Sequence, residues 1–316
     1  MGNKITIIGS GSVGSTIAYT LAVQGTASEI VMIDINVDKS LGEALDIRQG
    51  TPFCAPCSIY AGGYEDAKDS DVVILTSGMA RKPGQSRLDL AQANVDITGQ
   101  IIPQITKFAP DAIYIIVANP VDILTYQFHQ ISGLPENHII GSGTVLDTAR
   151  LRARLSEYFS ISQQNVHAYV FGEHGDSSFV PWSLANISNI PIDEYRDCLS
   201  EKDRQLLPPL VHEEVEDYIR KSGGKIIQRK GATFYAIAIS VCHICKCIFS
   251  GMDTTMTVSA MMHGEYGISG VCLSTLSVIG RDGVNGRIAA PLEDDEVAKL
   301  RKSADALHSV ISQLKF

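Results

Sequence analysis

Short apolar runs alternate with amphipathic helical stretches through the first 141 residues of the chain. Several of these runs are continuously apolar, as strands are when helices cover both faces of a parallel sheet. Helical stretches such as Val13–Gln24 and Leu88–Phe108 separate most of them. This alternation predicts an α/β domain with a doubly wound parallel sheet. The expected strands are Lys4–Gly9, Glu29–Asp34, Ser58–Ala61, Asp71–Thr76, Ala112–Ala118 and His138–Gly141.

The pattern changes after Gly141. Segments of alternating polarity near the C-terminus indicate antiparallel strands, and longer helical stretches precede and follow them. We therefore expect a second, α+β domain over residues 142–316, packed on a first domain over residues 1–141. Its expected elements are a helix over Thr144–Phe159, short strands around His167–Phe171, a polar helical region Glu201–Ser222 leading to Lys225–Phe249, strands in Thr255–His263 and Val271–Ile279, and a helix over Asp294–Leu314.

Composition supports an ordinary globular protein of about two domains. The chain has 316 residues, of which 45% are hydrophobic and 19% are charged. These fractions exclude a disordered tail or a coiled coil as the whole chain. The formal net charge of −9 leaves no global basic field for nucleic acid, so we expect no nucleic-acid partner. No apolar run approaches the ~18 residues of a membrane helix, so we expect no membrane partner and take the cytoplasm as the default location.

The seven cysteines are odd in number, which favours free thiols in a chain of this size. Two C-x-x-C spacings, Cys54/Cys57 and Cys242/Cys245, leave a zinc or redox site as the alternative. The second spacing lies in a helical stretch of small and apolar residues, where cysteine packs as a small hydrophobe. We therefore expect no metal site.

A glycine-rich turn follows the first expected strand and opens the first expected helix. The segment Gly9-Ser10-Gly11-Ser12-Val13-Gly14 is a G-x-G-x-x-G motif, and Asp34 ends the second strand twenty residues later. In this context the motif is typical of a Rossmann domain that binds a dinucleotide, and a fortuitous glycine turn is the alternative. Asp34 can bond two ribose hydroxyls and would repel a 2′-phosphate, which favours NAD over NADP. The expected cofactor-binding residues here are Gly9, Gly11, Val13, Gly14 and Asp34.

Further motifs give the chain a resemblance to the L-lactate/L-malate dehydrogenase family over almost its whole length. That resemblance implies a Rossmann domain joined to an α/β substrate-binding domain, a 2-oxo or 2-hydroxy acid as substrate, and a homo-oligomer, usually a tetramer. The motifs that carry it are Ala80-Arg81-Lys82-Pro83-Gly84-Gln85-Ser86-Arg87-Leu88, Ala118-Asn119-Pro120-Val121-Asp122, Gly141–Arg150, Gly172-Glu173-His174-Gly175-Asp176-Ser177 and Gly231-Ala232-Thr233.

The candidate catalytic residues are His174, Asp147 and Arg87. Reduction of a 2-oxo acid needs a proton on the carbonyl oxygen, and an imidazole that titrates near neutrality is a natural donor. The resemblance gives His174 that role and Asp147 the role of orienting it, while a plain turn histidine is the alternative. Arg87 is similar to the family's mobile arginine, which polarises the substrate carbonyl. The segment Ser77–Arg87 contains Gly78, Pro83 and Gly84, as suits a lid that closes over substrate.

Four residues are candidates for binding the substrate itself: Arg150, Asn119, Arg81 and Thr233. Arg150 lies three residues after Asp147, so both can face one cleft, where the guanidinium could hold the substrate carboxylate. The alternative for either arginine, Arg87 or Arg150, is a surface salt bridge. Asn119 resembles the family residue beside the nicotinamide and the substrate oxygen, so it is also a cofactor-binding candidate.

The choice between lactate and malate stays open in the sequence. Arg81 occupies the family's discriminating position, where malate enzymes carry an arginine for the second carboxylate of oxaloacetate and lactate enzymes usually carry glutamine. The histidine motif, Pro181-Trp182-Ser183 and the Thr233 region resemble the lactate branch, where the Thr233 methyl could pack against pyruvate. We assign the chain to the lactate branch, with malate dehydrogenase as the alternative and a non-catalytic NAD-binding oligomer as a remote one.

Arg152 and His167 match positions that bind fructose 1,6-bisphosphate at a subunit interface in allosteric bacterial members of the family. The resemblance therefore implies an allosteric site for this effector. The alternative is an ordinary surface arginine and a strand histidine.

Overall fold

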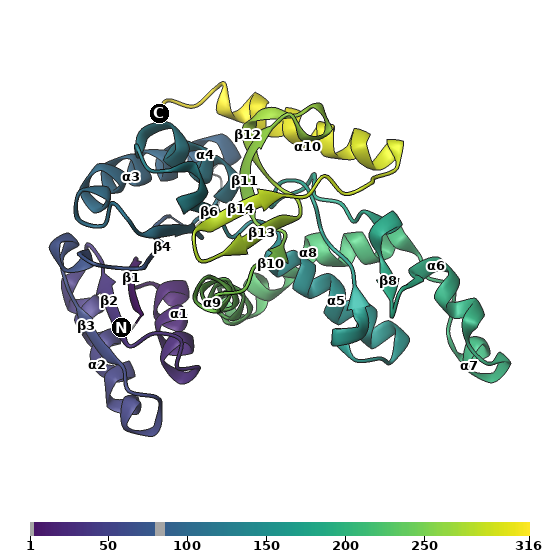
Figure 1. Cartoon of the computed structure of the whole chain (residues 1–316), viewed down its shortest axis with the longest axis horizontal. Coiled ribbons are helices and arrows are strands. Elements are labelled where there is room, and N and C mark those ends of the chain that lie inside the picture. Colours follow the sequence, from purple (N-terminus) through teal and green to yellow (C-terminus); the bar gives the residue numbers. More distant parts are fainter. Residues whose placement is uncertain (1–2, 80–85) are drawn as a thin grey trace.

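The computed structural model describes residues 3–79 and 86–316. Its centre is an eight-stranded sheet with the order β12-β11-β6-β5-β4-β1-β2-β3 (Figure 1). The first six strands in sequence are all parallel, and their order is that of a Rossmann sheet. They are β1 (Lys4–Ile8), β2 (Glu29–Ile33), β3 (Ser58–Ala61), β4 (Val72–Leu75), β5 (Ile113–Ile116) and β6 (Ile139–Gly141).

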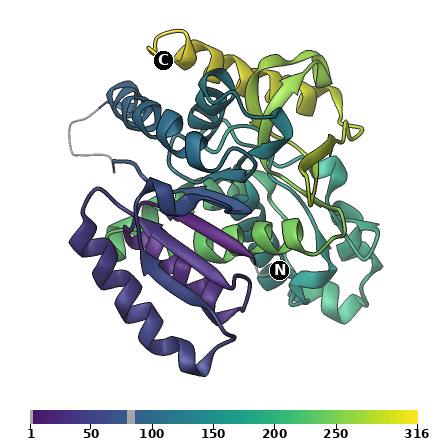
Figure 2. The ribbon, with the colours of Figure 1, turned by 60° about the vertical axis from the view of Figure 1, so that its left-hand side comes forward.

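Helices cover both faces of this sheet, which explains why its strands are apolar throughout. One core joins the sheet to α3 (Arg87–Phe108), α4 (Val121–Ile131) and α10 (Asp294–Ile311). The core on the opposite face joins it to α1 (Ser12–Val23), α2 (Val37–Gly50) and α9 (Tyr235–Phe249). Figures 1 and 2 show these two helical layers on either side of the strands. The expected doubly wound α/β fold is confirmed.

The second half of the chain extends the central sheet and adds two smaller ones. The antiparallel pair β11 (Ser259–His263) and β12 (Ser269–Ser274) joins its edge, with Ser259 opposite Gly141 of β6. The division into residues 1–141 and 142–316 stays a prediction, because one sheet runs across it. The small sheets contain β10 (Thr254–Met256), β13 (Ser277–Gly280) and β14 (Gly283–Arg287), and β7 (Val166–His167), β8 (Asn186–Ile187) and β9 (Ile190–Pro191).

The helices of the second half differ from the expected ones in their limits. The predicted region Glu201–Ser222 is two helices, α7 (Glu201–Leu206) and α8 (His212–Lys230), because Pro208 and Pro209 interrupt it. Helix α8 then continues through Gly223 and Gly224, which lie between the two expected helical stretches. It ends at Lys230, because Gly231 has a φ of +84°, which a right-handed helix does not contain. The remaining helices are α5 (Val145–Phe159) and the short α6 (Ile192–Tyr195).

All seven cysteines are free thiols, as predicted, and Cys242, Cys245, Cys247 and Cys272 are buried. Among the helices of the described residues, none combines the length and the apolar character that a membrane span requires. The short 3-10 turns are Thr51–Phe53, Tyr64–Ala67, Glu136–His138, Gln163–Asn165, Trp182–Leu184, Arg196–Cys198 and Glu265–Gly267.

Candidate active site

The glycine-rich turn joins β1 to α1 as the motif predicts. Gly9 has a φ of +104°, and a side chain there would come within 2.7 Å of the Thr76 hydroxyl. A side chain at Gly14 would collide with the carbonyl oxygen of Gly9, so α1 can pack this closely only with glycine. At Gly11, by contrast, a Cβ atom would meet nothing within 4 Å in the described part of the chain. The protein therefore needs glycine at positions 9 and 14 for itself, while position 11 leaves open space beside a helix N-terminus.

The carboxylate of Asp34 is fixed beside this turn. Its Oδ2 accepts the backbone N–H of Ser10 at 2.6 Å, and its Oδ1 accepts the backbone N–H of Asn36 at 2.9 Å. The turn and the acid at the end of β2 thus form one hydrogen-bonded unit. The open space at Gly11, the free helix N-terminus and this carboxylate fit a pyrophosphate and an adenosine ribose.

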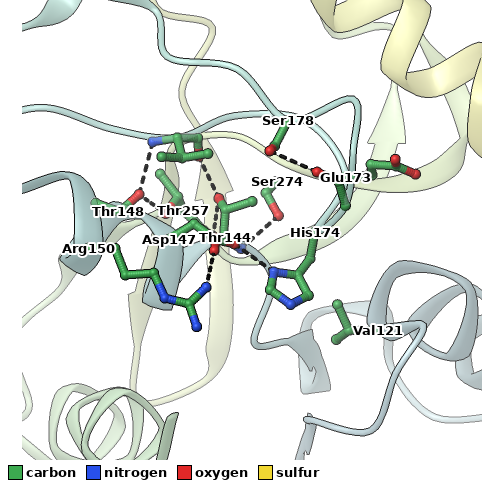
Figure 3. Close-up of polar contacts among 12 residues, drawn as sticks. Val121, Thr144, Asp147, Thr148, Arg150, Glu173, His174, Ser178, Thr257 and Ser274 are labelled. Atoms are coloured by element: carbon green, nitrogen blue, oxygen red, sulfur yellow. Dashed lines mark hydrogen bonds and ion pairs between the residues drawn. The ribbon is translucent and has the colours of Figure 1, made fainter. Parts of the chain in front are cut away.

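His174, Asp147 and Arg150 form a chain of charge-assisted contacts. The His174 Nδ1 atom lies 2.6 Å from Asp147 Oδ2, and Asp147 Oδ1 accepts from an Arg150 guanidinium nitrogen at 2.7 Å. Figure 3 shows Asp147 between the guanidinium and the imidazole. Asp147 and Arg150 are both on α5, one turn apart, as their spacing predicted. Because Asp147 engages Nδ1, the Nε2 atom of the ring is left for a reactant.

The start of α5 is tied to the segment that leads into the histidine loop. The Thr144 hydroxyl donates to the Val170 carbonyl at 2.5 Å, and the Val170 N–H donates to the Thr148 hydroxyl at 2.9 Å. The Thr144 N–H also donates to the Ser274 hydroxyl at 3.1 Å, which links α5 to β12. These bonds hold Asp147 and His174 in register, although 27 residues separate them.

Electrostatics favour an ionised acid and a protonated histidine. Burial alone would raise the pKa of Asp147, but the charges of His174 and Arg150 hold that pKa below its ordinary value. The negative charge of Asp147 raises the pKa of His174 above its ordinary value, against the opposing effect of burial. The pair can therefore keep a proton on the imidazole near neutrality and release it to a reactant.

These side chains line one cavity of about 280 Å³. It brings together six of the residues that the sequence predicted for the site, with Asp176 of the histidine motif beside them. The six are Val13, Asn119, Asp147, Arg150, His174 and Thr233.

Arg87 lies outside that lining, at the start of α3. Its guanidinium forms an ion pair of 2.5 Å with Asp176, and both side chains are about 70% exposed (70% and 72%). Asp176 itself lines the cavity, so Arg87 is held at its mouth. Arg81 lies outside the described residues, as do most of the residues of the expected lid.

Arg152 and His167 lie away from the cavity lining. Arg152 is on α5 and donates to the Gln163 carbonyl at 2.9 Å, and His167 is exposed on β7. Their role in binding an effector stays a prediction.

One wall of the cavity, from α8, was not identified from the sequence. Arg220, Gly223, Gly224 and Ile227 all face the cavity. Arg220 donates to the Ser178 carbonyl at 3.1 Å and pairs with Glu216 at 3.0 Å. The glycine pair inside a helical stretch was the available signal, since glycine in a helix interior usually has a packing or functional reason.

Comparison with known proteins gives the same result over the whole chain. Residues 3–141 match the family model described as "lactate/malate dehydrogenase, NAD binding domain", and residues 144–315 match "lactate/malate dehydrogenase, alpha/beta C-terminal domain". An L-lactate dehydrogenase of Thermoanaerobacter sp. (strain X514) is 47% identical over 99% of both chains. An L-lactate dehydrogenase of Acetivibrio thermocellus is 45% identical over 98% of this chain and 97% of its own.

Solved structures agree. A minor L-lactate dehydrogenase from Enterococcus mundtii, in a ligand-bound form, superposes with a TM-score of 0.92 at 37% identity and 99% coverage of both chains. A lactate dehydrogenase from a Medee basin deep-sea metagenome library superposes with a TM-score of 0.93 at 36% identity and full coverage of both chains. With both family models and these identities covering nearly every residue, the chain belongs to the lactate/malate dehydrogenase family.

Proposed function

We propose that this protein is an NAD-dependent L-lactate dehydrogenase that interconverts pyruvate and L-lactate. The observation that carries the proposal is the cavity in which His174, Asp147 and Arg150 meet at the carboxyl edge of a Rossmann sheet. The curated relatives named above are L-lactate dehydrogenases at up to 47% identity, which supports this branch of the family over the malate branch.

The cofactor is NAD, since residues 3–141 match the family's NAD-binding domain. We assign the pyrophosphate to the turn Gly9–Gly14 and the ribose hydroxyls to Asp34, with Val13 and Asn119 toward the nicotinamide. When bound, NADH supplies the hydride that adds to C2 of the 2-oxo acid. The carboxylate of Asp34 would repel the 2′-phosphate of NADP.

His174 donates the proton that the carbonyl oxygen needs during reduction, from Nε2. Asp147 holds the ring through Nδ1 and stabilises its protonated form, so the histidine is charged when a 2-oxo acid binds. In the reverse direction the neutral ring accepts the hydroxyl proton of lactate.

The substrate is held by Arg150, which among the described residues has N–H donors beyond the one that bonds Asp147 and can form a two-point contact with a carboxylate. Arg87 polarises the carbonyl oxygen after leaving Asp176. Thr233, which lines the cavity, packs its methyl group against that of pyruvate.

Steady-state kinetics with NADH test both the function and the branch. We expect kcat/KM for pyruvate to exceed that for oxaloacetate, and an Arg81→Gln variant to move the ratio further toward pyruvate. A hundredfold preference of the wild type for oxaloacetate would assign the protein to the malate branch instead. A ratio that Arg81→Gln leaves untouched would show that Arg81 does not discriminate.

The oligomer and its regulation are part of the same proposal. We propose a homotetramer in the cytoplasm, with fructose 1,6-bisphosphate bound by Arg152 and His167. Kinetics with and without the bisphosphate, together with light scattering, check these points. Activation that survives an Arg152→Gln substitution would place the effector elsewhere.

A further inference from the structure

A buried acid beside His174 has no part in the mechanism above. Asp122 lies in the first turn of α4 and is 3% exposed. Its Oδ2 accepts the backbone N–H of His174 at 2.8 Å, and its Oδ1 accepts the Ser259 hydroxyl at 2.6 Å. Ser259 is fully buried at the start of β11. The contacts described for Asp122 include no arginine or lysine, so its charge is stabilised by these two donors, by the N-terminus of α4 and by the charge of the His174 ring.

The loop that carries His174 needs such an anchor. Gly172 has a φ of +96°, and the residues from Glu173 to Ser178 form neither helix nor strand. The backbone N–H of His174 therefore takes no part in the backbone hydrogen bonds of a helix or sheet and donates to the Asp122 side chain instead. The ring of the same residue is held by Asp147 on α5. His174 is thus fixed by two carboxylates from two helices, one on its backbone and one on its imidazole.

A buried carboxylate outside the site, Glu296, shows what an ordinary structural role looks like. Glu296 is 4% exposed and accepts the backbone N–H of Ser183 at 3.0 Å and the Ser183 hydroxyl at 2.5 Å. It resembles Asp122 in burial and in accepting both a backbone N–H and a serine hydroxyl, and it also accepts the backbone N–H of Glu293 at 3.0 Å in the capping box of α10. Its partner Ser183, unlike His174, lies outside the cavity lining. Asp122 and Glu296 therefore differ in the residue that each one binds: His174 for Asp122 and Ser183 for Glu296.

We propose that Asp122 is a positioning residue for His174. Its carboxylate fastens the histidine loop to α4 and β11, and its negative charge favours the protonated imidazole that reduction requires. This inference rests on the proposed function, in which His174 donates the proton. Figure 3 places Val121, the residue before Asp122, beside the His174 ring.

The electrostatics agree with this geometry. Burial raises the pKa of Asp122 to about 6, against the lowering effect of the bonds from Ser259 and His174, and the charge of Glu173 raises it further. The charge of Asp122 adds to that of Asp147 in raising the pKa of His174. Burial raises the pKa of the Cys272 thiol on β12 well above its ordinary value, and the charge of Asp122 raises it further. The protonation state of His174 and that of Asp122 therefore depend on each other.

The test is an Asp122→Asn substitution, which keeps an acceptor for the His174 N–H and removes the charge. We expect the pKa of His174, followed by NMR in ¹³C-histidine-labelled protein and assigned with His174→Gln, to fall by roughly 0.5–1 unit. The alkaline limb of kcat/KM for pyruvate reduction should move to lower pH by the same amount, while the Kd for NADH stays unchanged.

Glu296→Gln is the matched control, because it removes an equally buried charge without contact to His174. It should leave the pKa of His174 and the alkaline limb where they are. Ser259→Ala is a second test variant if Asp122→Asn does not fold. Loss of the Ser259 hydroxyl raises the pKa of Asp122 and so reduces its negative charge at a given pH. The pKa of His174 should therefore fall, as in Asp122→Asn, but by less.

An unchanged pKa of His174 in Asp122→Asn, or in Ser259→Ala where only that variant folds, would overturn the inference. So would an equal shift in Glu296→Gln. A wild type that reduces no 2-oxo acid would refute the proposed function instead, and the NMR titration would still decide whether Asp122 acts on His174.

Discussion

At the scale of single residues, the site depends on a histidine whose proton affinity is set by its neighbours. Sequence reasoning found His174 and Asp147 from their motifs, and the structure joins them at 2.6 Å. It did not find Asp122, although the residue stood inside a quoted motif. A motif gives residue types, but only the packing of α4 against β11 and the histidine loop shows that this acid meets the His174 backbone.

The raised pKa of His174 predicts opposite pH dependences for the two directions. Pyruvate reduction needs the protonated ring, so its kcat/KM falls as pH rises through the pKa of His174, whereas lactate oxidation rises there. An Asp147→Asn substitution removes the charge that raises this pKa. Both limbs should therefore move to lower pH, and kcat for reduction at neutral pH should fall by about 10²-fold.

Stopped-flow and steady-state rates between pH 5.5 and 9.5, roughly the span over which histidine titrates, measure both limbs. Asp217→Asn on the exposed face of α8 is the control and should leave them in place. Limbs that do not move in Asp147→Asn would mean that a group other than His174 carries the proton.

At the scale of elements, prediction succeeded where one physical cause dominates. The strands of the first half lie within two residues of their expected limits, because a sheet covered on both faces demands uninterrupted apolar runs. The two expected helical stretches that meet at Gly223 and Gly224 are continuous there in α8. Glycine weakens a helix but does not stop it unless the chain needs a positive φ, as it does at Gly231. Tertiary packing of α8 over the cavity overrode the local signal.

The glycine pair of α8 predicts that alanine at positions 223 and 224 raises the stability of the protein and narrows the cavity. Neither residue needs to be glycine for the protein's own packing. A Cβ at Gly224 meets nothing within 4 Å in the described chain, and one at Gly223 meets only the Arg150 guanidinium at 3.7 Å. The Gly223→Ala/Gly224→Ala variant should therefore be more stable, by about 0.5–1 kcal/mol for each site. It should also lose activity toward 2-oxo acids with side chains longer than methyl, relative to pyruvate.

Thermal unfolding and kcat/KM for pyruvate and 4-methyl-2-oxopentanoate measure the two effects. Gly42→Ala is the matched control, because Gly42 lies inside α2 and outside the cavity lining, and a Cβ there would meet nothing within 4 Å in the described chain. It should raise the melting temperature without changing the substrate ratio. An unchanged ratio in the double variant would show that α8 does not limit substrate size.

At the scale of the molecule, the two predicted domains share one sheet, and both contribute residues to the core on each of its faces. Strand β11 covers the edge of β6 through the Ser259–Gly141 pairing, and α9 packs on the face that holds α1. The sequence predicted both halves separately, because periodicity reports on each segment alone. It could not show that a hairpin more than a hundred residues downstream completes the first sheet, since such pairing leaves no local pattern.

This arrangement predicts that residues 1–141 do not fold stably alone. Without β11 the edge of β6 is unpaired, and without α9 the apolar residues Ile5, Ile7, Ile17 and Leu21 lose part of their cover. The isolated fragment should bind a hydrophobic dye, lack a cooperative thermal transition and bind NADH at least tenfold more weakly than the full chain.

Circular dichroism, dye fluorescence and NADH fluorescence titration test this, with the full chain as reference. Adding residues 142–316 as a separate fragment should restore the transition, because it returns β11 and α9. A fragment that melts cooperatively and keeps the NADH affinity of the full chain would show that the first half needs neither element.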